Sequence, residues 1–301
     1  MPAAVWIPLT VMLLGVMGVA YAWQIERKAF RLRRVTVPVL PPGTPDLTVL
    51  HLSDMHFTAG QPWKERWVRK LAALEPDLVV DTGDNLGGHD GIQPTFAALE
   101  PLLARPGVFV PGSNDWFEPT PKNPARYLRR PDGDRRHYGP RLPWGEVRAH
   151  FTDAGWIDLT HRRTTIKLRG VTVELAGVSD AHLLADHYER VAGPVRADVA
   201  IGLSHSPEPR VIDAFAADGF SLVMSGHTHG GQLRVPGYGA LVTNCGLDRK
   251  RARGLSKWPN GGYLHVSAGL GTSRYAPVRF ACPPEATLLT LTSRTELTGP
   301  R

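Results

Sequence analysis

The sequence predicts an α/β fold, because short apolar runs alternate with amphipathic segments of helical length. The apolar runs have the length and the β-branched content of buried strands, and they begin at Val49, Leu78, Val108, Val199 and Phe220. Helices are expected over 63–74, 92–103, 142–154 and 209–218. Alternation of this kind is typical of helices packed on a largely parallel sheet. The part of the chain from residue 239 onward is expected to be rich in strands.

The first two apolar runs close on residues that bind metals or phosphates. The first run closes on Asp54 and His56, and the second closes on Asp84 and Asn85. Asp81 lies at the end of the second run and is expected to hydrogen-bond the turn before Asp84 rather than to bind a metal.

The three later runs add an amide and three imidazoles. They close on Gly112-Ser113-Asn114-Asp115, on His205, and on Gly226-His227-Thr228-His229-Gly230. Because ligands of α/β sheets collect at the carboxyl ends of strands, the five strand ends point to one site. The glycines beside the paired histidines let the backbone turn sharply and approach a bound anion.

The mixture of oxygen and imidazole ligands suits Mn²⁺, Fe²⁺ or Zn²⁺ better than Ca²⁺ or a thiolate-bound metal. The candidate ligands are more numerous than one four-coordinate ion needs, so the sequence predicts two divalent metal ions that share a carboxylate. Two metals roughly 3.5–4 Å apart clamp a phosphoryl group and activate a water between them. The candidate ligands are Asp54, His56, Asp84, Asn114, His205, His227 and His229.

The order of these motifs resembles that of the calcineurin-like metallophosphoesterases, from about residue 47 to residue 291. The resemblance implies a four-layer α/β/β/α sandwich and hydrolysis of a phosphoric ester. Three later stretches are similar to a membrane-associated bacterial branch that includes UDP-diacylglucosamine hydrolases: Gly177-Val178-Ser179-Asp180, Gly269-Leu270-Gly271-Thr272-Ser273 and Pro283-Pro284-Glu285.

The resemblance also implies a role for each ligand. The first metal would be held by Asp54, His56 and His229, the second by Asn114, His205 and His227, and both by Asp84. Asn85 is expected to stabilise its loop or to contact the phosphate rather than to bind a metal.

The third motif departs from the family pattern, which usually reads Gly-Asn-His-Asp. A gapless match places Ser113 at the metal-ligand position, whereas a shift of one residue places Asn114 there. We favour the shift, because an amide oxygen is a better neutral ligand than a hydroxyl, and we assign Asn114 to the catalytic residues. Under either alignment the family's acid histidine is missing, and an amide does not donate a proton as an acid does. His182 is the candidate replacement acid, and the alternative is a histidine on a surface loop.

The N-terminal segment is apolar enough to cross a membrane. Residues 5–23 carry no charge, and their length just spans a hydrocarbon core. No Lys or Arg precedes this run, whereas Arg27 and Lys28 follow it, so the positive-inside rule places the catalytic domain in the cytoplasm. Ala20-Tyr21-Ala22 resembles a cleavage site, but the basic start of a secretory signal is missing. We expect a single-pass anchor over 1–25, a basic and Pro-rich linker over 26–46, and the catalytic domain over 47–301.

Charge and cysteine content limit the kinds of binding partner that the sequence predicts. A second basic region, 122–148, contributes to the pI near 9.6, and within it Arg126 and Arg129 are candidate contacts to an anionic, phosphate-containing substrate. The alternative is a solvated basic loop. No recognised nucleic-acid module accompanies these charges, so a nucleic-acid partner is not expected. Cys245 and Cys282 match no zinc spacing and are expected to be free thiols.

The leading hypothesis is a membrane-anchored, two-metal phosphoesterase that cleaves a phosphodiester or pyrophosphate bond. A lipid linked to a nucleotide is one candidate substrate, since the anchor would hold the site near amphiphilic molecules. The first alternative is a phosphodiesterase of soluble nucleotides whose anchor only localises it. The second is a metal-binding scaffold or sensor whose turnover is impaired by the altered third motif.

Overall fold

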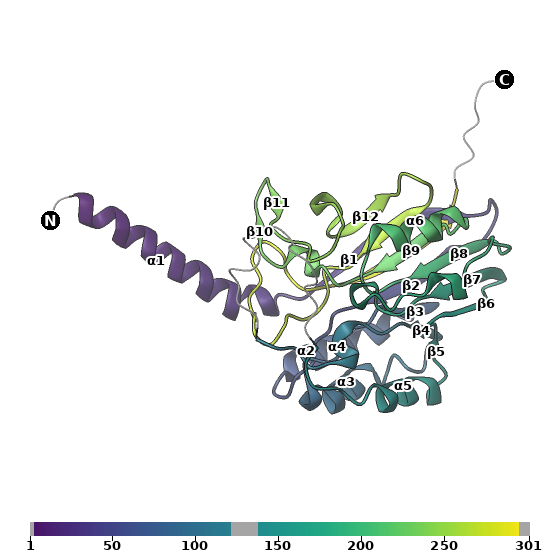
Figure 1. Cartoon of the computed structure of the whole chain (residues 1–301), viewed down its shortest axis with the longest axis horizontal. Coiled ribbons are helices and arrows are strands. Elements are labelled where there is room, and N and C mark those ends of the chain that lie inside the picture. The colour runs from purple at the N-terminus through teal and green to yellow at the C-terminus, as the bar shows by residue number, and fades with distance from the viewer. Residues whose placement is uncertain (1–2, 122–137, 295–301) are drawn as a thin grey trace, which may run out of the picture.

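The computed structural model describes residues 3–121 and 138–294, which form two six-stranded sheets and a projecting N-terminal helix (Figure 1). The first sheet has the order β1-β14-β2-β3-β4-β5 and the second β12-β13-β9-β8-β7-β6. The strands of the first sheet are β1 (Arg31–Leu40), β2 (Leu47–Leu52), β3 (Leu78–Asp81), β4 (Gly107–Phe109), β5 (Ile157–Asp158) and β14 (Glu285–Ser293). Those of the second are β6 (Arg162–Leu168), β7 (Val171–Gly177), β8 (Val199–Leu203), β9 (Leu222–Ser225), β12 (Gly254–Lys257) and β13 (Tyr263–Val266).

Helices cover the outer face of each sheet, so the predicted four-layer α/β/β/α sandwich is confirmed. The core between the sheets joins apolar side chains of both, such as Val80 of β3 and Ile201 of β8. A second core packs the first sheet against α2, α3 and α5, and a third packs the second sheet against α6. The helices are α1 (Ala3–Gln24), α2 (Pro62–Lys70), α3 (Ile92–Leu99), α4 (Ser113–Trp116), α5 (Trp144–Asp153) and α6 (Pro209–Ala217).

Parallel pairing brings the predicted strand ends to one edge. In the first sheet β2, β3 and β4 are parallel neighbours, and in the second β7, β8 and β9 are. Their carboxyl ends therefore open into loops on the same side of each sheet. This register places the loops after β2, β3 and β4 opposite those after β8 and β9.

The predicted linker over 26–46 is wrong in its central part. Residues Arg31–Leu40 form β1, which pairs in parallel with β14 with one register shift between Pro38 and Leu40. The residues show why: Val35, Val37 and Val39 alternate with Thr36 and Pro38, which is the period of a strand with one buried face. Pro38 is compatible with this strand because β1 lies at the edge of its sheet. The basic and Pro-rich composition obscured the alternation.

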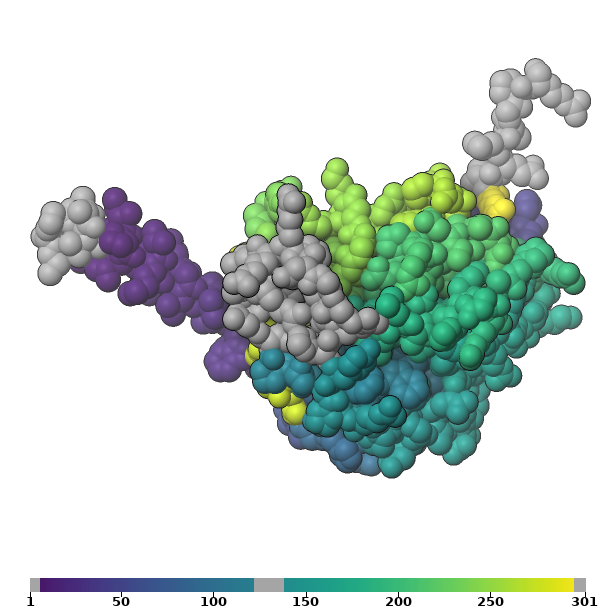
Figure 2. Space-filling view, in the orientation of Figure 1, coloured from purple at the N-terminus to yellow at the C-terminus, as the bar shows by residue number. Residues whose placement is uncertain are grey.

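Helix α1 projects from the domain and is long and apolar enough to cross a membrane, by length and composition (Figures 1 and 2). A signal sequence near an N-terminus satisfies the same criterion. Only its last turns contact the domain, where the backbone N–H of Arg279 donates to the carbonyl of Ala22 at 3.2 Å. Just beyond the helix, the buried Glu26 carboxylate accepts the backbone N–H groups of Ala281 and Cys282.

A buried histidine pair joins the two sheets. His51 of β2 and His265 of β13 are fully buried, and their Nδ1 atoms lie 2.9 Å apart. Burial lowers the pKa of His265 to about 3, and burial together with His265 lowers the pKa of His51 well below 6.5. Both rings are therefore neutral in the folded protein at neutral pH.

This pair predicts a loss of stability in acid. A histidine whose pKa is depressed by folding binds a proton more readily in the unfolded state. The free energy of unfolding therefore falls as the pH drops below the unfolded pKa of about 6.5. Between pH 6.5 and 5.5 the wild-type protein should lose about 1 kcal/mol more unfolding free energy than His265→Asn. Urea unfolding in detergent at both pH values measures this difference. Equal losses in the two proteins would contradict the assignment.

Candidate metal centre

The first group of predicted ligands converges at the ends of β2 and β9. Asp54, His56 and His229 each offer a ligand atom, and these atoms lie within 4.8 Å of one another. His56 Nε2 lies 3.2 Å from His229 Nε2, and His229 Nε2 lies 3.6 Å from Asp54 Oδ1. Asp54 and His56 are buried, and His229 is nearly so.

The second group contains Asp84 and His205 and shares Asp54 with the first. Asp84 Oδ2 lies 3.4 Å from His205 Nε2 and 3.5 Å from His56 Nε2. One oxygen atom of the β3 loop therefore lies near imidazoles of both groups. Both carboxylates, Asp54 and Asp84, are positioned between the two sets of rings.

Backbone carbonyls fix which nitrogen of each ring faces the centre. The His205 Nδ1 donates to Thr82 O at 2.7 Å, and the His229 Nδ1 lies 3.2 Å from Gly271 O. The His227 Nε2 lies 3.2 Å from Asn244 O. The nitrogens left to face the centre are therefore Nε2 of His205 and of His229, and Nδ1 of His227.

This donor set fits divalent metals. Nε2 of His205 and Nε2 of His229 face carboxylate oxygens at 3.4 and 3.6 Å, an arrangement that is favourable only with a proton or a metal cation between each pair. The buried Nε2 of His205 has no hydrogen-bond partner among the described residues. Imidazole and carboxylate ligands suit first-row divalent ions, and the hydrogen bonds to backbone carbonyls are the outer contacts that orient such ligands.

The pKa shifts report the same charge crowding. Burial raises the pKa of Asp54 to about 6 and lowers the pKa of His56 to about 4. Burial alone would lower the pKa of His205, but the Asp84 carboxylate holds it well above 6.5. The His205 ring in turn holds the pKa of Asp84 well below its usual range, against the effect of burial. A proton on His205 thus occupies the place that a metal cation would take.

The backbone of the site is unusually strained. Five of the predicted ligands adopt positive φ, a region that L-residues with side chains rarely occupy. They are Asp54 (48°), His56 (42°), Asp84 (57°), His227 (66°) and His229 (49°). Two glycines permit the close packing: a Cβ at Gly112 would lie 2.2 Å from Asp84 Oδ1, and one at Gly226 would lie 1.8 Å from Ser53 Oγ.

The structure places the other predicted site residues as follows. The Asn114 side chain lies against Asp84, with Nδ2 donating to Oδ2 at 2.7 Å, while Ser113 begins α4. The His182 ring lies 4.7 Å from that of His227, so this histidine belongs to the rim of the site rather than to a remote loop. Asn85 is buried beside Asp115. Arg126 and Arg129 lie outside the described residues.

The structure also tests the predictions made for Asp81 and for the two cysteines. Asp81 accepts the backbone N–H of Gly83 at 2.9 Å, which confirms its turn-forming role. Cys245 and Cys282 are both free thiols, as predicted.

Sequence reasoning missed Asp115, which joins two ligand loops. Its carboxylate accepts the backbone N–H groups of Asp84, Asn85 and Gly112 at 2.8–2.9 Å. Asp115 is fully buried, and its pKa is raised to about 7, chiefly by burial and then by the charge of Asp84. Its position three residues after the N-cap Gly112, whose backbone N–H it accepts as the acidic residue of a capping box would, is the sequence signal that could have identified it.

Sequence reasoning also missed Arg279, a fully buried cation behind His229. Its guanidinium donates to the carbonyls of Ala268, Gly269, Gly271 and Cys282. Because Gly271 O also faces Nδ1 of His229, Arg279 fixes the loop that orients this ring. A lone arginine in an apolar stretch carries no pattern that distinguishes it from a surface residue.

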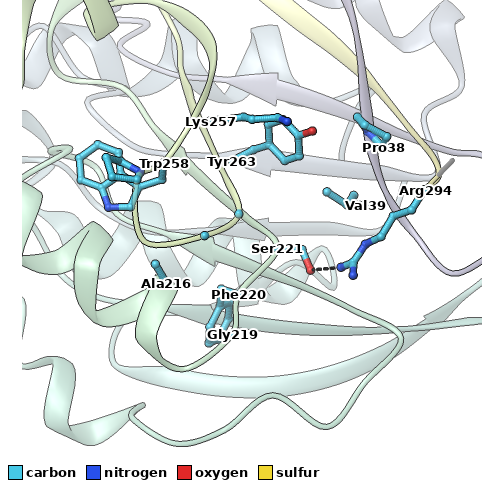
Figure 3. A pocket seen from close by; sticks show the side chains of 13 residues that line it. Pro38, Val39, Ala216, Gly219, Phe220, Ser221, Lys257, Trp258, Tyr263 and Arg294 are labelled. Carbon is cyan, nitrogen blue, oxygen red and sulfur yellow. Dashed lines mark hydrogen bonds between the residues drawn. The ribbon is translucent and has the colours of Figure 1, made fainter. Parts of the chain in front are cut away.

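A separate hollow of about 440 Å³ lies at the opposite ends of the strands (Figure 3). It is lined by Ser221, which precedes β9, and by Tyr263, which begins β13, whereas His227 follows β9. In Figure 3, Ser221 and Arg294 form a hydrogen bond across it, 3.3 Å long. None of the predicted ligands lines this hollow, so it plays no part in the metal centre.

Comparison with known proteins places this geometry in a family. A family model described as calcineurin-like phosphoesterase matches residues 47–231, the segment that holds every predicted ligand. The chain belongs to this family. As a calcineurin-like phosphoesterase it is a metal-dependent hydrolase of phosphoric esters, and the predicted family is confirmed.

Three relatives extend the comparison beyond the matched segment. The phosphodiesterase YaeI of Escherichia coli (strain K12) is 33% identical over 91% of this chain and 93% of its own length. The UDP-2,3-diacylglucosamine pyrophosphatase LpxG of Chlamydia muridarum is 25% identical over 81% and 83%. A Bos taurus protein named transmembrane protein with metallophosphoesterase domain is 28% identical over 85% of this chain and 56% of its own length.

The Asp115 carboxylate generates a prediction for this phosphoesterase. Asp115→Ala leaves three buried N–H groups without their acceptor, and it should lower the unfolding free energy by about 3 kcal/mol and reduce bound metal. Urea unfolding and elemental analysis of the purified protein measure the two effects. Asp153→Ala, on the exposed end of α5, is the matched control and should change neither. A change below about 0.5 kcal/mol in the Asp115 variant would refute this positioning role.

Proposed function

We propose that the chain is a membrane-anchored phosphoesterase that uses two divalent metal ions to cleave a phosphodiester or pyrophosphate bond. The observation that carries the proposal is the convergence of the Nε2 atoms of His205 and His229 on the carboxylates of Asp84 and Asp54. Asp54, His56 and His229 would hold one ion, and Asn114, His205 and His227 the other. Asp84 would be common to both, because its Oδ2 lies near rings of each group.

The bound ions would supply charge to the phosphoryl group and lower the pKa of a water. The residues of the chain would supply positioning. Asp84 is held by two hydrogen bonds from Asn114, one from the backbone and one from the side chain, both 2.7 Å long. Asn85 would contact the phosphate with its amide, and Arg126 and Arg129 would attract the anionic substrate. Manganese is the ion with which we propose to begin, since oxygen and imidazole ligands both suit it.

His182 is proposed to protonate the leaving oxygen. The side chain at position 114 is an amide and cannot serve as an acid. The His182 ring lies next to His227 at the rim of the site, and its backbone N–H is fixed by Asp180 Oδ1 at 2.9 Å. A leaving oxygen at the rim would therefore meet an imidazole from the β7 loop.

The substrate is proposed to be amphiphilic, with a nucleotide-linked lipid as the first class to test. Two observations support this choice: α1 is apolar along its length, and the relative LpxG is named as acting on UDP-2,3-diacylglucosamine. The bovine relative is named as a transmembrane protein. The basic residues Arg27 and Lys28 after the helix support a catalytic domain that faces the cytoplasm.

Hydrolysis of bis(p-nitrophenyl) phosphate by the full chain in detergent tests the activity. After metal removal and reloading with Mn²⁺, the wild-type protein should turn over, and Asp84→Ala should lose at least about a hundredfold, because the shared carboxylate is gone. Asp90→Ala, an exposed carboxylate in the segment after β3, is the matched control and should retain activity. Bound metal without any turnover would instead favour a metal-binding scaffold.

The role of His182 predicts a dependence on the leaving group. His182→Ala should slow hydrolysis of a phenyl phosphodiester about 10²-fold more than that of a p-nitrophenyl phosphodiester, because only the poorer leaving group needs a proton. Steady-state kcat/KM for the two substrates measures the ratio. An equal loss on both would show that His182 does not act as the acid.

A further inference from the structure

The exposed apolar side chains of the catalytic domain are concentrated on one surface. Among the described residues beyond α1 and Ile25, eight large apolar side chains are exposed. Only Tyr138 and Leu184 lie elsewhere. The other six define the apolar face: Leu233, Val235, Tyr238, Leu241, Tyr275 and Phe280, each 39–61% exposed. A soluble surface with no partner would distribute such residues more evenly.

The apolar face is built around a small hairpin. Strands β10 (Arg234–Val235) and β11 (Gly239–Ala240) carry Val235 and flank Tyr238 at the turn. Leu233 pairs with Phe280 in an isolated bridge, and Leu241 N–H donates to Leu233 O at 3.4 Å. The hairpin presents its exposed side chains outward while Ala240 is buried beneath it.

The end of α1 is fixed to this face. The Tyr21 ring packs edge-on against Phe280 at 6.3 Å, and Arg279 N–H donates to Ala22 O. The Glu26 carboxylate accepts the backbone N–H groups of Ala281 and Cys282. In Figures 1 and 2 the hairpin lies at the end of the domain from which α1 projects. A bilayer crossed by α1 would therefore meet the apolar face at its surface.

The charges on this face suit anionic lipid headgroups. The sequence contains no Asp or Glu from Gly230 to Leu247 or from Gly269 to Pro284, the two segments that carry the six apolar residues. Cationic side chains border them: the exposed Arg249 bonds to the Tyr238 hydroxyl at 2.6 Å, and Lys28 is exposed after α1. Apolar side chains flanked by cations bind the interface of anionic bilayers.

We infer that the apolar face docks on the surface of an anionic bilayer beside α1. This inference rests on the membrane anchoring in the proposed function and adds a second point of contact to it. Docking would hold His229, four residues before Leu233 in the chain, close to the lipid surface. A membrane-embedded phosphate ester would then reach the metal centre without leaving the bilayer.

Photo-crosslinking of the full chain tests the docking. Benzoylphenylalanine replaces one residue at a time, and the protein is reconstituted into nanodiscs of phosphatidylcholine and phosphatidylglycerol. The replaced positions are Val235 and Tyr238 on the apolar face, Leu13 on α1 as the positive control, and Lys167 on the exposed edge strand β6 as the negative control. Mass spectrometry then measures lipid adducts at each position.

We expect lipid adducts at Val235 and Tyr238 at least about tenfold above those at Lys167. Adducts at Leu13 without adducts at Val235 or Tyr238 would overturn the docking while leaving the anchor intact. Protein–protein adducts at Val235 in place of lipid adducts would show that a second copy covers the face, which also overturns it. No adducts at Leu13 would refute the anchor and the docking together. None of these results depends on turnover of bis(p-nitrophenyl) phosphate, which tests the phosphoesterase activity separately.

Discussion

Crowding of buried charge is the constraint on which the site depends. The Nε2 atoms of His205 and His229 face the carboxylates of Asp84 and Asp54, and a backbone carbonyl lies behind each ring. Such an arrangement needs a cation between the groups, which a proton supplies on His205 and which a bound metal would supply in its place. The affinity for metal therefore depends on the hydrogen bonds that orient the candidate ligands as well as on the ligands themselves.

The scaffold that holds these charged groups together lies outside the set of candidate ligands. Asp115 joins the loops after β3 and β4, and Arg279 holds the loop behind His229. The core between the two sheets fixes the strand ends from which these loops begin. Because five candidate ligands have positive φ, the surrounding contacts must keep a conformation that short peptides would avoid. Arg279 also contacts the end of α1, so one residue supports both the candidate metal centre and the attachment of this helix to the domain.

Much of the fold and of the site was predictable because buried strands and metal ligands leave strong patterns. The strands ending near Asp54, Asp84 and His205 are short apolar runs followed by ligand-type residues, and the structure brings all three together. Strand β1 was hidden by its arginines and Pro38, whose edge position could not be known from the sequence. Arg279 was missed for a different reason: five of its six side-chain hydrogen bonds go to backbone carbonyls, which every residue possesses, so no residue pattern marks them.

Electron paramagnetic resonance of the Mn²⁺-loaded full chain tests the central claim most directly. The account predicts two bound ions per chain with a spin-coupled signal, since ions that share the Asp84 carboxylate lie roughly 3.5–4 Å apart. The same account predicts that Asp84→Ala loses the coupling, while Asp90→Ala keeps it. A single bound ion, or two ions that remain uncoupled in the wild-type protein, would contradict the shared-carboxylate centre whatever the activity of the enzyme.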